Sequence, residues 1–97
     1  MNKGNDFERD FSLKNHQIYL PVLVSSQLLR SFNAGQIDVA GLSHKKKSWV
    51  LHLFELKIKK YPSVSQWRRL QRSQDYLSKV LEIETKLEVK FCQKAEP

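Results

Sequence analysis

A carboxylate and an amine stand two residues apart, at Glu55 and Lys57, inside an apolar and β-prone run that covers residues 48–58. In a strand, residues i and i+2 face the same side, so Glu55 and Lys57 project together while Phe54 and Leu56 project from the other face. Burying charged groups is costly unless they are paired or bound to a metal ion. The pattern therefore suits a hydrolytic metal site.

A second carboxylate, Asp38, lies in the preceding β-prone run, although aspartate is depleted in strands. If the chain turns tightly at Lys46 and Lys47, Asp38 lies directly across from Glu55, with the two Cβ atoms roughly 5 Å apart. Two carboxylates that close repel each other unless a cation lies between them. A slip of one residue would destroy this arrangement, so the inference depends on the turn.

The chemistry of these side chains fits hydrolysis assisted by Mg²⁺ or Mn²⁺. Mg²⁺ prefers hard oxygen ligands and keeps several waters, and Asp38 and Glu55 would supply two carboxylates. The Lys57 amine could orient an attacking water or stabilise the negative transition state. A cross-strand ion pair between Lys57 and either carboxylate, with no metal, is the other interpretation.

The elements that must position these residues follow from periodicity and breakers. Ser63 and Gln66 have capping-box spacing, and the apolar stripe of the helix that follows begins at Trp67. We expect helices over residues 5–14 and 64–83, and strands over residues 21–26 (with an extension to 30), 36–42, 48–58 and 85–92. Residues 43–48 are expected to form a polar connection. The chain is thus predicted to be one α/β domain, residues 1–97, in the order α-β-β-β-α-β.

Glu8 lies beside an apolar stripe formed by Phe7 and Phe11 on the first expected helix. In that position its carboxylate could point into a cleft. It could equally be an ordinary first-turn acid that the helix dipole favours.

The formal net charge of +7 indicates an anionic partner, and nucleic acid is the commonest one. Charge that only solvates the protein is the alternative. Candidate phosphate contacts are basic residues that lie largely outside the apolar stripe of the long helix, namely Arg68, Arg69, Arg72 and Lys79. The turn residues Lys45, Lys46 and Lys47 either touch a DNA backbone or are simply solvated.

The single cysteine, Cys92, excludes an internal disulfide and fits a reducing compartment. No apolar run reaches the roughly 20 residues of a membrane span. The N-terminal residues lack the apolar core of a signal peptide. We therefore expect a cytoplasmic protein without a membrane segment.

Three segments, residues 35–40, 50–57 and 67–77, resemble the PD-(D/E)XK nuclease superfamily, and most of all its small Holliday-junction-resolvase-like members. The resemblance implies a restriction-endonuclease-like core, a mixed sheet of about four strands flanked by helices. It implies that Asp38, Glu55, the Leu56 carbonyl and Glu8 bind Mg²⁺ or Mn²⁺, and that Lys57 is the catalytic lysine. It also implies a DNA substrate, and a homodimer, because two symmetric cuts need two sites.

The chain departs from that family at two places. Gln36 stands where the resolvase-like relatives usually have glutamate, and Gln71 and Tyr76 are too far apart for the family's Gln-x-x-x-Tyr motif. We expect a metal-dependent DNA endonuclease that hydrolyses phosphodiester bonds. A catalytically inactive nuclease-like domain that binds nucleic acid or a protein partner is the alternative, and a small basic RNA-binding domain is a third interpretation.

Overall fold

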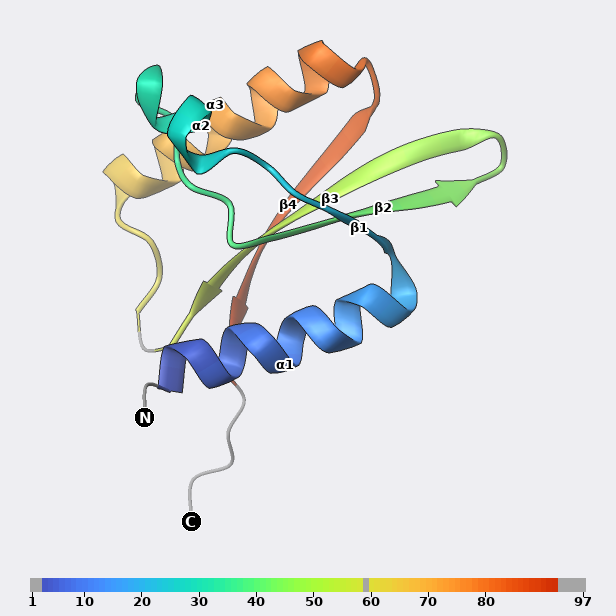
Figure 1. Cartoon of the computed structure of the whole chain (residues 1–97). Coiled ribbons are helices and arrows are strands. Elements are labelled where there is room, and N and C mark those ends of the chain that lie inside the picture. The colour runs from blue at the N-terminus through green and yellow to red at the C-terminus, as the bar shows by residue number, and fades with distance from the viewer. Residues whose placement is uncertain (1–2, 59, 93–97) are drawn as a thin grey trace.

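The computed structural model describes residues 3–58 and 60–92 (Figure 1). Seven elements follow one another along the chain. They are α1 (Lys3–Ile18), β1 (Leu20–Val22), α2 (Ser26–Ser31), β2 (Val39–Lys45), β3 (Ser48–Lys57), α3 (Val64–Leu81) and β4 (Glu84–Phe91). Among the described residues, no helix is both long and apolar enough to cross a membrane.

The four strands form one sheet in the order β1-β2-β3-β4. β1 pairs with β2 and β2 with β3 in antiparallel fashion, whereas β3 and β4 are parallel. A parallel pair needs a long crossover, and α3 supplies it. The chain is therefore an α/β structure with a mixed four-stranded sheet flanked by helices, as the sequence predicted.

The two faces of the sheet are covered by different helices (Figure 1). α1 packs on one face, where the rings of Phe11 and Phe54 lie 5.0 Å apart. The core lies on the other face, under α2 and α3. There the fully buried Leu51 and Leu53 of β3 pack with Leu29, Leu70 and Leu77. Because Glu55 and Lys57 continue the series of Leu51 and Leu53, they project from the face that α3 covers.

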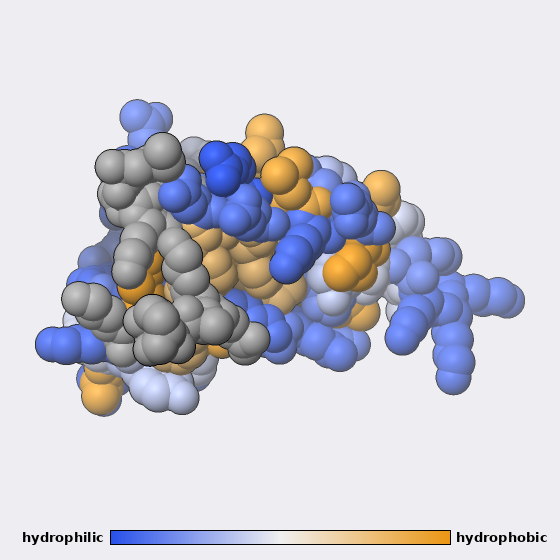
Figure 2. All heavy atoms as spheres, turned by 90° about the horizontal axis from the view of Figure 1, so that it is seen from below, coloured by the Kyte–Doolittle hydropathy of each residue, from blue (hydrophilic) through white to orange (hydrophobic). Residues whose placement is uncertain are grey.

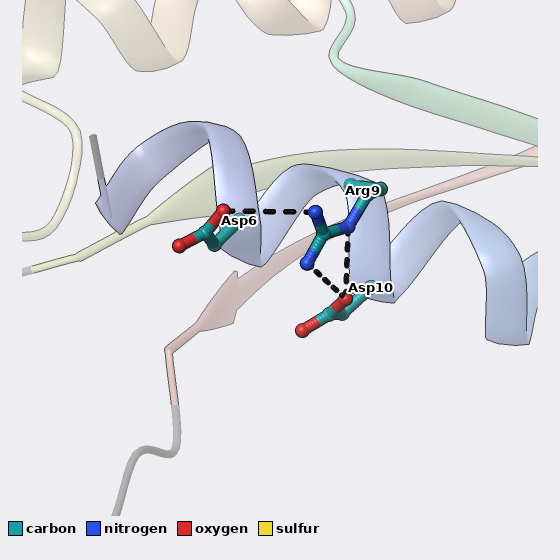
Figure 3. Close-up of polar contacts among 3 residues, drawn as sticks. All are labelled: Asp6, Arg9 and Asp10. Atoms are coloured by element: carbon teal, nitrogen blue, oxygen red, sulfur yellow. Dashed lines mark hydrogen bonds and ion pairs between the residues drawn. The ribbon is translucent and has the colours of Figure 1, made fainter. Parts of the chain in front are cut away.

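α1 is longer than the predicted helix over residues 5–14, and its C-terminal end lies close to the sheet. A Cβ atom added to Gly41 would lie 2.6 Å from Cβ of Tyr19 and 2.8 Å from the Asn15 side chain. Only glycine leaves room for that contact. On the outward side of α1, Arg9 forms ion pairs with Asp6 and Asp10 (Figure 3). Leu13 and Ile18 of the same helix are also exposed.

The predicted strand over residues 21–26, with its extension to 30, is mostly wrong. Only residues 20–22 are a strand, and α2 follows. Ser25 caps this helix, since its hydroxyl accepts a hydrogen bond from the Leu28 N–H at 3.2 Å. Leu29 is 1% exposed, so α2 is held by burial of one leucine in the core.

The second strand lies about three residues later than predicted. It covers Val39–Lys45 instead of residues 36–42, and the polar connection at 43–48 shrinks to a two-residue turn. The last predicted helix and strand are confirmed to within two residues, as α3 and β4.

Candidate functional site

A tight hairpin aligns the two carboxylates. Lys45 pairs with Ser48, and both turn residues between them have positive φ, as a type I′ turn requires. The register runs on without a slip to Val39 opposite Phe54. One further step brings Asp38 opposite Glu55, so the predicted turn and register are confirmed.

Just before β2 begins, the Asp38 side chain takes the place of a backbone hydrogen-bond acceptor for β3. Its Oδ2 accepts a hydrogen bond from the backbone N–H of Leu56 at 2.8 Å. The N–H and C=O of one strand residue point to the same neighbour. The Leu56 carbonyl is therefore directed to the same edge as Asp38, beyond the start of β2.

α3 holds the loop that carries Asp38. The Gly35 N–H donates to the Arg69 carbonyl at 2.8 Å, and the Ser73 hydroxyl donates to the Gly35 carbonyl at 2.5 Å. The Arg72 guanidinium donates to the Asn33 carbonyl at 2.6 Å. These bonds fix residues 33–35 against the helix, and so position Asp38 a few residues later.

Glu55 is the most perturbed acid of the site. Its side chain is 15% exposed, and its buried Oε1 has no hydrogen-bond partner. The Lys57 ammonium lies 3.6 Å from Glu55 Oε2. Burial, and then the neighbouring Asp38 charge, raise the pKa of Glu55 to about 7, although Lys57 acts in the opposite direction. The ion pair that was the alternative to a metal site is therefore present, but it joins Lys57 and Glu55 within one strand and does not cross between strands.

A small pocket of about 240 Å³ opens at the two carboxylates. It is lined by residues from the Asp38 loop, β3 and the first turns of α3: Gly35, Gln36, Asp38, Glu55, Gln66, Arg69 and Leu70. The buried, unpartnered oxygen of Glu55 beside a second carboxylate suits a hard cation, and Mg²⁺ is often held by one or two carboxylates together with waters. The residues present therefore fit a divalent metal ion.

Glu8 does not join this pair. It is exposed on α1, which packs on the sheet face opposite Glu55. Within the described residues, no three His, Cys, Asp or Glu side chains gather closely enough to hold a metal ion. The structure thus brings together Asp38, Glu55, Lys57 and the Leu56 backbone, and leaves Glu8 outside.

The basic residues predicted to touch DNA fall in three places. Arg69 lines the pocket and Arg68 is exposed one residue earlier. Arg72 uses its guanidinium within the chain, and Lys79 pairs with Asp75 at 3.1 Å. Lys45, Lys46 and Lys47 are exposed at the hairpin end.

Two residues of the site were not predicted to belong to it. Ser73 is completely buried, and it interrupts the apolar stripe between Leu70 and Leu77. A serine at a core position of a helix is a signal that its hydroxyl has a partner inside the protein. Gln66 was expected only as part of the helix cap, and it also lines the pocket.

Comparison of the chain with protein-family models, with curated proteins and with solved structures gave no match. The candidate function therefore rests on the geometry and chemistry of the described residues.

Proposed function

We propose that the protein is a metal-dependent DNA endonuclease with a restriction-endonuclease-like core of the PD-(D/E)XK type. One observation carries the proposal. Asp38 and Glu55 meet from two neighbouring segments at one pocket, and Lys57 lies one same-face step along the strand. Two carboxylates that can hold a metal ion and a nearby amine are groups that metal-assisted phosphodiester hydrolysis can use.

Asp38, Glu55 and the Leu56 carbonyl would hold Mg²⁺ or Mn²⁺. The bound ion would lower the pKa of a coordinated water and neutralise charge on the phosphate. Lys57 places an ammonium group beside these ligands, where it can orient a water molecule or stabilise a negatively charged transition state. The backbone bond from Leu56 to Asp38 keeps the second carboxylate at this position.

Positive charge around the pocket supports DNA as the substrate. Arg69 belongs to the pocket wall and Arg68 is exposed beside it. Their guanidinium groups suit phosphate oxygens, which they can bind in bidentate fashion. The chain as a whole carries a formal net charge of +7.

The chain contains its own control for the catalytic lysine. Glu88 and Lys90 form the same Glu-x-Lys pattern on β4, with an ion pair of 3.5 Å, but both side chains are more than 40% exposed. We expect Lys57→Ala to cleave DNA about 10²–10³-fold more slowly, since a positioned transition-state donor is lost. Lys90→Ala should cleave at the wild-type rate. The measurement is single-turnover cleavage of junction, duplex and single-stranded DNA in Mg²⁺ or Mn²⁺.

DNA binding in EDTA completes this experiment. Lys57→Ala should still bind DNA, because the basic residues proposed to contact phosphates remain. If the wild-type protein cleaves none of the three substrates, the nuclease proposal is wrong. Equal rates for Lys57→Ala and the wild type would likewise remove Lys57 from the chemistry.

Two observations favour the alternative, a nuclease-like domain that binds nucleic acid or a protein partner without cleaving. Gln36 lines the pocket where the resolvase-like pattern has an acid, and Glu8 lies outside it. Both reduce the negative charge available to a metal ion. Wild-type protein that binds DNA in the assay above and leaves every substrate intact would establish this alternative.

A further inference from the structure

The end of the β2–β3 hairpin is a projecting, basic arm, which we define as residues 44–49. All six residues are exposed. Figure 1 shows the hairpin extending beyond the helices, and Figure 2 shows hydrophilic side chains gathered at that end of the molecule. At its base the arm borders a pocket that His44, Lys45 and Trp49 line together with the end of α1.

The turn at the tip of the arm is strained. Lys46 has φ 50° and Lys47 has φ 69°. A two-residue turn of this kind favours Asn-Gly, because a side chain at positive φ collides with the backbone. No ion pair among the described residues involves either lysine. Strain that no ion pair of these lysines offsets within the described residues points to a role in binding outside the chain.

The arm is stiffened just behind its tip. His44 and Trp49 lie directly opposite each other, and their rings are 4.5 Å apart. Cross-strand pairs of this type stabilise a two-stranded ribbon. The lysines at the tip are therefore held at a fixed distance from the rest of β3.

The distance from the tip of the arm to the pocket can be expressed in base pairs of DNA. Lys47 lies in the turn just before β3, and eight residue steps separate it from Glu55. At about 3.3 Å per residue the span is roughly 26 Å. B-DNA rises 3.4 Å per base pair, so the span equals about eight base pairs.

We propose that the arm binds the phosphate backbone of duplex DNA about eight base pairs from the phosphate that contacts the pocket of Asp38 and Glu55, where Arg69 lines the wall. Lys46 and Lys47 supply the contacts. This inference extends the proposed function, since the pocket is taken as the second point of contact. Binding through the arm therefore requires a duplex that extends about eight base pairs from the pocket. The arm contacts phosphates only, so this binding does not depend on the base sequence.

The test uses a variant that keeps the turn and removes the charges, Lys46→Asn with Lys47→Gly. The control, Lys14→Gln with Lys90→Gln, removes the same charge from α1 and β4, where Lys14 is exposed and the Lys90 side chain is 44% exposed. Binding to labelled duplexes from 6 to 24 base pairs is measured in EDTA at several salt concentrations, by fluorescence anisotropy. For long duplexes, we expect the arm variant to bind more weakly and to lose about two from the slope of log K against log salt. For duplexes shorter than about eight base pairs, it should bind as the wild type does.

Three results overturn the inference: an equal loss at every duplex length, an equal loss in the control variant, or the same length dependence with single-stranded DNA. The readout is binding without metal, so it does not depend on cleavage. A length-dependent arm in a protein that cuts nothing would refute the nuclease proposal alone. If the wild type cleaves DNA and the arm variant binds every duplex as tightly as the wild type does, the proposal for the arm alone is refuted.

Discussion

Glu55 makes the stability of the metal-free protein depend on pH. The group has its ordinary pKa of 4.5 when unfolded and a pKa of about 7 in the native state. Between these values the native state binds more protons than the unfolded state, so stability falls as pH rises. The free-energy cost of ionising Glu55 in the folded protein is therefore absent below pH 4.5 and fully present above pH 7.

Glu55→Gln should remove that penalty. We expect the variant to be about 1–3 kcal/mol more stable than the wild type at pH 8 and nearly equal to it at pH 4. Urea unfolding in EDTA at the two pH values measures the difference. Glu88→Gln, at the exposed copy of the pattern, should show no such dependence, and a wild-type protein that gains stability from pH 4 to pH 8 relative to Glu55→Gln would contradict the account.

Residue types revealed part of the site and hid the rest. Glu55, Lys57 and Asp38 could be predicted because charge in a β-prone run needs an explanation, and because the two lysines of the turn fix the register. Glu8 could not be placed, since a residue beside an apolar stripe can face either the protein or the solvent, and the sequence does not show which element packs against it. Ser73 was missed because its partner, the Gly35 carbonyl, is 38 residues away.

At the scale of the elements, the hairpin turn offers a separate prediction. Lys46→Asn with Lys47→Gly replaces two residues at positive φ by the pair that a type I′ turn favours. The variant should be about 1–3 kcal/mol more stable than the wild type, because left-handed strain is relieved. Chemical denaturation measures it, and a less stable variant would show that the turn is not strained.

Some elements could be predicted from the sequence and others could not. α3 and β4 have strong periodicity, and their bounds were predicted to within two residues. α2 is only six residues long and carries no periodic pattern, so the β-prone residues before it suggested a strand. β2 was shifted because Asp38 takes up the Leu56 N–H with its side chain, and backbone pairing begins only at the next residue.

The whole molecule carries more positive charge than its ion pairs balance, and DNA binding should show it. Arg68 is exposed beside the pocket, whereas Arg72 is engaged with the Asn33 carbonyl. Arg68→Ala should weaken binding to all DNA sequences alike and reduce the salt slope by about one. Arg72→Ala should instead lower stability, because the loop before Asp38 loses a charged hydrogen bond.

Titrations of binding against salt, together with thermal unfolding, separate the two arginines. A loss of affinity for one DNA sequence only would mean that Arg68 reads a base. No loss at all would mean that the charge at this position only solvates the protein.

β3 serves both faces of the sheet at once. Its odd-numbered residues build the core and then the pocket, and its even-numbered residues, such as Phe54, pack against α1. A substitution in β3 changes the packing on only one face of the sheet. Insertion or deletion of a single residue between the turn and Glu55 would exchange the two faces. The carboxylate would then lie under α1, and the pocket would receive Phe54 after an insertion or Leu56 after a deletion. Over evolutionary time, β3 can therefore vary in composition much more freely than in length.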